Sequence, residues 1–415
     1  MDRRTFLGLL MATSLPFPAR AGQCSDGAAN AADIDWLTTR MAAHYAYLPD
    51  RHVDIEKLRR TYVAAAGEVC DPHAFLGVLE RFLAEFHDHH IEANVNNAAS
   101  PQLVPTGAEL WAAFHNGRAV IEAVRPGSVA AQSAILAGDE VISIGGVPVA
   151  QAVATQAPRC LSAPDPEADD YTLRILLAGT HSAQRVFQVR GASGVTVAVT
   201  LPPHQRDPDG PLLTVRRIDP QIACLRIENS LGDSGLVGEF DKAVEQLRNM
   251  RGLILDLRNT PSGGNTDVAE PILGRFVTRD SGYQRGFRPG PGRTLAKDSY
   301  VRHVAARGPF QVTSNLAVLC DRWTGSMGEG MTIGLDAFGR AAVVGTKMAG
   351  LRGATEGVTL PKSGIGVNFP VERLYHLNGT PREDFVPREF VDLMRAKGAD
   401  PILERGVAVL RAMPR

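Results

Sequence analysis

The sequence predicts a mixed α/β protein with a helical N-terminal region, a β-rich middle region and an α/β core. Three patterns in the 415 residues carry this prediction. Residues 30–95 place apolar side chains at helical spacing. Residues 104 to about 203 alternate β-rich runs with turn residues. From residue 204 onward, apolar strands alternate with amphipathic helices, which is typical of a mostly parallel sheet covered by helices.

The first 21 residues have the pattern of a secretory signal peptide. "MDRRTFLGLLMATSLPFPARAG" has a basic start, an apolar stretch from Phe6 to Leu15 and a small-x-small site at 19–21. Arg3 and Arg4, followed by Thr5-Phe6-Leu7, resemble a twin-arginine signal, which implies bacterial export of a folded protein to the periplasm. The alternative is a general secretory signal in which the two arginines are only the positive region.

Composition excludes some classes of partner. The net charge is −1 at pH 7, which argues against nucleic acid as the main partner. No apolar run beyond the leader is long enough for stable membrane insertion. The five cysteines include no Cys-x-x-Cys pair and form no disulfide framework for so long a chain. Cys224 and Cys320 lie in apolar runs and are expected to be buried in strands.

The N-terminal region, residues 22–103, contains two clear helical stretches. They are "VDIEKLRRTYVAAAGEV" and "DPHAFLGVLERFLAEF". In the second, Asp71 is expected to cap the helix and Pro72 to take its first position.

The middle region, residues 104–203, resembles a PDZ domain of the bacterial protease type. The resemblance lies in "GRAVIEAVRPGSVAAQSAILAGDEVISIGGVPV", a strand, a short helix, and a second strand with its turn. PDZ domains bind extended peptides by strand addition and often hold a free carboxylate. The resemblance implies that "PTGAELW" is the carboxylate-binding loop, with Gly107, Ala108, Glu109 and Leu110 as peptide-binding residues.

The core, residues 204–415, contains four short apolar strands, and two amphipathic helices lie between them. The strands are "IACLRIENS", "GLILDLRN", "NLAVLCD" and "AAVVGT", and the helices are "SGLVGEFDKAVEQLRNM" and "SMGEGMTIGLDAF". A β-hairpin is expected in "GVTLPKSGIGVNFPVERLYHLNG", and Asp400-Pro401 begins the last helix. The Gly- and Arg-rich residues 279–300 fit either a mobile flap or a long surface loop.

Two loops of the core carry candidate chemistry. In "TGSMGEG", Ser326 stands where a buried strand meets a helix, so helix N–H groups and the helix dipole can stabilise negative charge beside it. Alone, such a serine is also an ordinary helix cap. "GLILDLRNTPSGGN" ends another strand in a glycine turn whose N–H groups can gather on an anion, although it is not a Walker loop. Phosphate binding or a plain strand-helix turn are the alternatives there.

Three segments together resemble the carboxyl-terminal processing peptidases, also called tail-specific proteases, and the related tricorn protease core. They are "DLRNTPSGG", "VLCDRWTGSMGE" and "GRAAVVGTKMAG", in that order after a PDZ-like region. The resemblance implies a crotonase/ClpP-like α/β core with a helical N-terminal region and a PDZ domain. It also implies Ser326 as nucleophile, the N–H groups of Met327 and of Gly263 or Gly264 as oxyanion donors, and no cofactor.

The sequence departs from the processing peptidases at the position of their catalytic base. Their catalytic lysine falls on Leu351 here, and Lys347 lies four positions earlier, within reach only of a shifted loop. The tricorn-like branch uses a histidine instead, and its segment resembles "LAEFHDHHIEANV", which places His90 at the catalytic position. The same branch uses a carboxylate that "NGTPREDFVP" offers as Glu383.

The histidine-rich segment has two further interpretations. His87 and His89 would lie on one side of a strand at metal-ligand spacing, although no second ligand cluster follows and no metal is expected. A polar surface strand is the other alternative.

The sequence therefore predicts an exported serine endopeptidase that cleaves unfolded or C-terminally presented polypeptides. The main rival is an inactive homologue that binds peptide tails as a scaffold or regulator. A third hypothesis is a small-ligand carrier, since retinoid-binding relatives use the same core.

Overall fold

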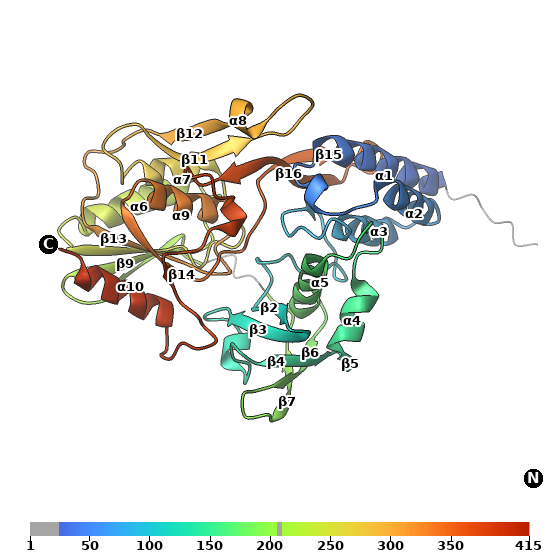
Figure 1. Ribbon diagram of the computed structural model, residues 1–415, viewed down its shortest axis with the longest axis horizontal. Helices are drawn as coiled ribbons and strands as arrows, with labels where there is room; N and C mark the ends of the chain where they lie inside the picture. The colour runs from blue at the N-terminus through green and yellow to red at the C-terminus, as the bar shows by residue number, and fades with distance from the viewer. Residues whose placement is uncertain (1–24, 206–209, 415) are drawn as a thin grey trace, which may run out of the picture.

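The computed structural model describes residues 25–205 and 210–414 as three adjoining regions. Figure 1 shows the N-terminal helices at one end, the β-rich region below them and the α/β core at the other end. The predicted leader, residues 1–21, lies outside the described residues. Within the described ranges, no helix has both the length and the apolar character needed to cross a membrane.

The N-terminal region is helical, as predicted. It consists of α1 (Ser25–His44), the 3-10 turn η1 (Leu48–Asp50), α2 (Ile55–Gly67), α3 (Pro72–Ala84) and the short strand β1 (Glu92–Ala93). The carboxylate of Asp54 accepts the Lys57 amide, and that of Asp71 accepts the Ala74 amide, so both helices are capped. Pro72 is the first residue of α3, which confirms the predicted start.

The middle region is an antiparallel sheet with two helices on it. The sheet order is β2-β3-β4-β6-β7, with β5 paired to β4. Its elements are β2 (Leu110–His115), β3 (Arg118–Val124), η2 (Ala130–Gln132), β4 (Glu140–Ile144), β5 (Val147–Pro148), α4 (Val149–Gln156), α5 (Pro166–Ala178), β6 (Arg185–Arg190) and β7 (Thr196–Leu201). Apolar residues of α5 and of the strands form one buried cluster, which explains why apolar residues recur along the β-rich stretches of the sequence.

The main sheet of the core has the order β17-β14-β13-β10-β9-β8, and all its neighbours are parallel except β8. This confirms the predicted parallel sheet. The strands are β8 (Leu213–Arg217), β9 (Ile222–Ile227), β10 (Gly252–Asp256), β13 (Asn315–Cys320), β14 (Ala341–Gly345) and β17 (Glu389–Phe390). The helices are α6 (Gly235–Gln246), α7 (Thr266–Leu273), α9 (Met327–Ala337) and α10 (Pro401–Ala412), which starts where expected.

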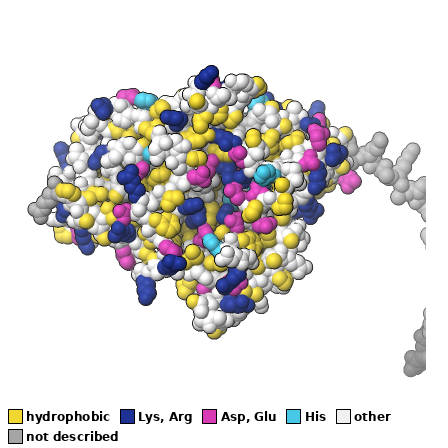
Figure 2. Space-filling model, viewed as in Figure 1, with side chains coloured by type: hydrophobic (Ala, Val, Ile, Leu, Met, Phe, Trp, Pro, Cys, Tyr) yellow, Lys and Arg dark blue, Asp and Glu magenta, His cyan; other side chains and the backbone are white. Residues whose placement is uncertain are grey.

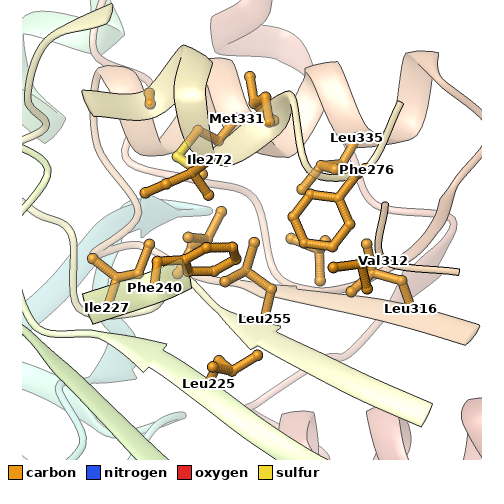
Figure 3. Packing of buried hydrophobic residues seen from close by; sticks show 14 of the residues in the cluster. Leu225, Ile227, Phe240, Leu255, Ile272, Phe276, Val312, Leu316, Met331 and Leu335 are labelled. Atoms are coloured by element: carbon orange, nitrogen blue, oxygen red, sulfur yellow. The ribbon is translucent and has the colours of Figure 1, made fainter. Parts of the chain in front are cut away.

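Helices cover both faces of this sheet. Side chains of α6, α7 and α9 pack with Leu225 and Leu255 on one face, as Figure 3 shows. Those of α10 pack with Cys224 and Ile254 on the other. Burial on both faces explains why these strands are almost wholly apolar in sequence. Cys224 and Cys320 are buried and free, as expected for strand residues of this sheet.

A second, antiparallel sheet joins the core to the N-terminal helices. Its order is β1-β16-β11-β12, with β15 paired to β16, and it contains β11 (Ser281–Phe287), β12 (Tyr300–Val304), β15 (Ala354–Thr359) and β16 (Gly366–Tyr375). The pair β15–β16 confirms the predicted hairpin. The segment 279–300 forms β11, the short α8 (Leu295–Asp298) and the start of β12, so it is a paired β-ribbon and not a bare loop.

The strand β1 ties the N-terminal region to the core. Glu92 and Ala93 pair with Asn368 and Val367 of β16. The apolar faces of the N-terminal helices also share one buried cluster with β16 residues such as Phe369. The segment that precedes β1 is thereby held against β16, which lies more than 200 positions later in the sequence.

Candidate active site

Two core loops meet because the strands before them are neighbours. Strands β10 and β13 run parallel, with Asp256 opposite Leu319, so their carboxyl ends share one edge of the sheet. The loops that follow are bonded to each other. The Thr260 amide donates to the Trp323 carbonyl at 3.1 Å, and the Gly325 amide donates to the Thr260 carbonyl at 3.2 Å. The glycine turn and the Ser326 turn therefore lie side by side.

Ser326 starts α9 in a strained backbone conformation. Its φ is 47° and its ψ is −107°, a region that residues other than glycine rarely adopt. Such strain persists only where surrounding contacts impose it, and it concentrates at functional sites. Met327, the next residue, lies in the first helical turn, where amides have no partner within the helix. Among the described residues, no acceptor meets the Met327 amide.

Gly263 lies against the Ser326 side chain. A Cβ atom on Gly263 would stand 2.4 Å from the Ser326 Cβ and 3.0 Å from its Oγ, and the glycine φ is +65°. The Gly263 amide donates to the Thr260 carbonyl at 3.0 Å. Of the two predicted glycine donors, Gly264 is thus the one whose amide meets no acceptor within the described ranges. Free amides of Met327 and Gly264 fit an oxyanion site better than that of Gly263.

Glu329 holds the Ser326 turn, a role that the sequence analysis missed. One oxygen of its carboxylate accepts the Ser326 amide at 2.8 Å, and the other accepts the Gly350 amide at 2.9 Å. The Arg382 guanidinium lies 3.8 Å away. Burial raises the pKa of Glu329 to about 7. The spacing Ser-x-x-Glu at a helix start, typical of a capping box, was the available signal.

His90 is fixed in the tautomer that a general base needs. Its Nδ1 lies 2.6 Å from the backbone carbonyl oxygen of Arg352. A carbonyl oxygen only accepts hydrogen bonds, so Nδ1 carries the proton and Nε2 keeps its lone pair. Burial, followed by the charge of Arg382, lowers the pKa of His90 to about 4, so the ring is neutral at pH 7.

Both sides of the His90 backbone are anchored. The Asp88 carboxylate accepts the His90 amide at 2.9 Å and the Tyr45 hydroxyl at 2.8 Å. On the C-terminal side, β1 pairs with β16. Arg352 belongs to the same loop as Gly350, which Glu329 binds, so one loop contacts both the Ser326 turn and the His90 ring. The two described residues Ser326 and His90 are not directly hydrogen-bonded to each other.

The strand interpretation of the "HDHH" segment is wrong. Residues 87–90 form an irregular turn between α3 and β1, and His87 has a φ of 37°. His87 pairs with Asp165 at 2.8 Å, while the His89 ring stacks on Tyr171. The three histidines therefore have three separate partners. In the part of the chain that the structure describes, no group of three His, Cys, Asp or Glu side chains is placed to hold a metal ion.

The two positions considered for a catalytic lysine, 351 and 347, differ in burial. Leu351, where the processing peptidases have their lysine, is buried, and its Cδ1 would lie 3.1 Å from a Cβ on Gly325. An apolar side chain thus stands beside the Ser326 turn. Lys347 is exposed in the loop after β14.

Glu383 is a half-buried carboxylate near this loop. It lies in the 3-10 turn η3 (Arg382–Asp384), and its Oε2 is buried without a hydrogen-bond partner among the described residues. Burial raises its pKa, while the charges of Arg382 and Arg352 partly oppose that shift. Its side chain can support the site electrostatically, but the group that orients His90 is the Arg352 carbonyl.

The predicted peptide-binding loop already has partners within the chain. The Gly107 amide donates to the Leu103 carbonyl at 2.6 Å, and the Trp323 indole donates to the Ala108 carbonyl at 2.7 Å. Glu109 is buried in an ion pair with Arg185 at 2.9 Å. A peptide-binding role for Gly107, Ala108, Glu109 and Leu110, the first residue of β2, stays a prediction.

Side chains of α5 also occupy one edge of β2. The Asp170 carboxylate accepts the Phe114 amide at 2.7 Å, and Arg174 donates to the Ala112 carbonyl at 3.0 Å. Strand addition at this edge therefore requires these two side chains to move.

The middle region forms side-chain hydrogen bonds with both site loops. Arg125 donates to the Asn259 side chain at 2.9 Å, and Arg322 donates to Glu122 at 2.7 Å. Figure 2 shows acidic and basic side chains gathered at the centre of this face, where the three regions meet.

Comparisons with known proteins agree with this architecture. Residues 221–385 match Peptidase family S41. No curated protein matches the chain. The mature CPAF structure is 17% identical with a TM-score of 0.58, over 88% of this chain and 92% of that chain. The photosystem II D1 C-terminal processing protease is 18% identical with a TM-score of 0.58, over 92% of this chain and 97% of that chain.

The matched segment contains β9, β10, β13, α9 and both site loops. Residues 221–385 are thus similar to an S41 peptidase domain, and the chain is a serine-type peptidase. The two structures, at these identities, show that the fold is shared, including a helical N-terminal region and several sheets. The PDZ resemblance and the tricorn-like branch remain predictions.

If Ser326 acts as the predicted nucleophile, replacing Gly263 with alanine is expected to lower kcat by about 10²-fold, because the new methyl group collides with Ser326 and displaces it from the free amides of Met327 and Gly264. Steady-state kinetics and thermal unfolding measure the effect. Gly364→Ala is the matched control, since Gly364 has a φ of +73° and nothing within 4 Å of an added Cβ. Equal loss of activity in both variants would contradict the assigned contact.

Proposed function

We propose that this chain is an exported serine endopeptidase that cleaves unfolded or C-terminally presented polypeptides through an acyl-enzyme. The observation that carries the proposal is that one loop binds both elements: Arg352 accepts from the neutral His90 ring, and Gly350 donates to Glu329, which holds the strained Ser326 turn. Ser326 is the nucleophile and His90 the general base, as in the tricorn-like branch. The middle region would present the polypeptide to this site.

The chemistry follows from the orientation of each group. As the Ser326 Oγ attacks the scissile carbonyl carbon, its proton passes to Nε2 of His90, whose Nδ1–H stays on the Arg352 carbonyl. The amides of Met327 and Gly264 stabilise the oxyanion of the tetrahedral intermediate. His90 then gives the proton to the leaving amine, and water releases the acyl group by the same path. Glu383 supports the imidazolium by its charge.

A buried leucine at the lysine position favours a histidine base over a lysine base. Lys347 is exposed, whereas a lysine needs desolvation or a like charge to lose its proton near neutral pH. His90 has its lone pair at pH 7 without such help.

Export is supported by two observations. The first 21 residues have the pattern of a signal peptide. Cys70 is disulfide-bonded, and disulfides persist in oxidising compartments such as the bacterial periplasm.

The acyl-enzyme step is tested by labelling the mature chain with a fluorophosphonate, which reacts with activated serines. Mass spectrometry of the digest is expected to place one label on Ser326, and Ser326→Ala is expected to take none. A folded chain that takes no label while it binds C-terminal peptides would favour the inactive, tail-binding homologue instead.

The pH dependence of kcat/KM distinguishes the two bases. Because kcat/KM reports groups of the free enzyme, its acid limb is expected near pH 4, where His90 becomes protonated and loses its lone pair. An unperturbed histidine would place that limb near 6.5. A peptide substrate assayed from pH 3.5 to 9, with circular dichroism at each pH, measures the profile. Activity that rises only in the alkaline range would point to Lys347.

A further inference from the structure

A cavity of about 480 Å³ lies between α3, the segment 89–104 and α5. None of the residues of the two site loops lines it, so it is separate from the Ser326 turn. Its volume is within the range of small-molecule sites and exceeds that of one side chain. The cavity therefore has room for a small ligand or for a short stretch of polypeptide.

The cavity wall is mainly apolar. It includes Leu83, Ile91, Leu103, Val104, Ile175 and Leu176. Val95 and Leu103, which also line it, are 41% and 40% exposed. Apolar surface thus continues from the cavity to the outside of the protein. A ligand with an apolar body can enter there, and its binding is favoured because this apolar surface is removed from water.

Two carboxylates at this wall have no cationic partner. Glu80 comes from α3 and Glu92 from β1, and neither makes an ion pair with any described residue. Asn368 donates to Glu92 at 3.3 Å. Burial raises the pKa of both groups, and side-chain hydrogen bonds from Ser100 to Glu80 and from Asn368 to Glu92 oppose that shift only in part. The one arginine of the wall, Arg81, donates to Gln156 instead.

The His89 ring forms part of the cavity wall. Both of its ring nitrogens are buried and lack hydrogen-bond partners among the described residues. The ring stacks on Tyr171 with centroids 4.5 Å apart, and burial lowers its pKa well below the usual value, so it is neutral. One nitrogen of a neutral imidazole is an acceptor. Because both nitrogens are closed off from the cavity and the charges of Arg174 and Arg352 also lower the pKa of the ring, His89 contributes wall surface and no ligand acceptor.

We propose that this cavity binds an ammonium group on an apolar body, with Glu80 and Glu92 as acceptors for the cation. Two sources share this chemistry: a lysine side chain within an apolar stretch of polypeptide, or a free alkylamine. The site differs from the β2 edge, because Asp170 and Arg174 face β2 while Tyr171 and Ile175, one position further along α5, face the cavity.

Calorimetric titration of the mature Ser326→Ala chain tests the proposal without dependence on peptidase activity. The probes are n-hexylamine, n-hexanol and hexanoate at pH 7. Hexylamine is expected to bind about tenfold or more tightly than hexanol, because charge-assisted hydrogen bonds add to the apolar contact. Hexanoate is expected to bind most weakly.

Variants locate the binding. Glu80→Gln combined with Glu92→Gln is expected to remove the preference for hexylamine over hexanol, and Ile175→Trp is expected to weaken all probes by filling the cavity. Glu56→Gln, an exposed carboxylate of α2, is the matched control and is expected to change nothing. Equal binding of hexylamine and hexanol, or no measurable binding of either, would overturn the proposal.

A peptide pair separates the two sources. Acetyl-Leu-Leu-Lys-Leu-Leu-amide is compared with the same peptide that has norleucine in place of lysine. If only the lysine peptide binds and competes with hexylamine, the natural source is polypeptide. If hexylamine binds and neither peptide does, it is a small amine. Binding of the norleucine peptide as tightly as the lysine peptide would contradict recognition of the cation.

Discussion

Replacing Ser326 with alanine is expected to reduce kcat/KM for an unfolded protein substrate by about 10⁴-fold or more, because no other hydroxyl replaces the nucleophile and only binding and oxyanion stabilisation remain. If Ser326 were only a helix cap, the same change would instead lower stability by about 1 kcal/mol and leave activity intact. Kinetics and thermal unfolding of the same preparation separate the two roles.

Ser234→Ala is the matched control for this experiment. Ser234 is the exposed residue that precedes α6. It is expected to retain full activity. Activity in Ser326→Ala within a few-fold of the unmutated chain would exclude Ser326 as the nucleophile.

Replacing His90 with alanine is expected to lower kcat by about 10³- to 10⁴-fold, since an unassisted serine hydroxyl is a weak nucleophile at its free pKa. His90 is assigned to proton transfer and not to substrate binding, so KM is expected to stay similar. The buried neutral ring, with Nδ1–H on the Arg352 carbonyl, is the physical basis of the prediction. Steady-state kinetics at pH 7 measures it.

Two control variants accompany His90→Ala. His73→Ala changes an exposed histidine of α3 and is expected to be neutral. Lys347→Ala is expected to retain activity within about twofold, as for surface substitutions generally. If Lys347→Ala loses activity while His90→Ala keeps it, the base is a displaced lysine and the tricorn-like assignment is wrong.

The core was predictable because its patterns are local. A strand buried on both faces is a continuous apolar run, as in "GLILD" of β10, and the helix between two parallel strands shows apolar spacing. The caps Asp71 and Asp400 mark helix starts through short-range contacts. Such features need no knowledge of distant residues.

The assembly of the site depends on contacts that no local pattern encodes. The strand β1 has two residues and forms only because β16 offers its edge, so residues 87–90 looked like part of a longer strand. The hydrogen bond from Nδ1 of His90 to the Arg352 carbonyl joins positions 262 residues apart. The role of Glu329 was visible as a Ser-x-x-Glu spacing, but its bond to Gly350 was not.

The most direct test of the assigned site is the cleavage of casein at pH 7 by the mature chain, compared with Ser326→Ala, His90→Ala and Lys347→Ala in one assay. We expect the unmutated chain and Lys347→Ala to degrade casein, and Ser326→Ala and His90→Ala to leave it intact. Cleavage by His90→Ala at the rate of the unmutated chain, or cleavage that requires Lys347, would contradict the proposed serine-histidine site.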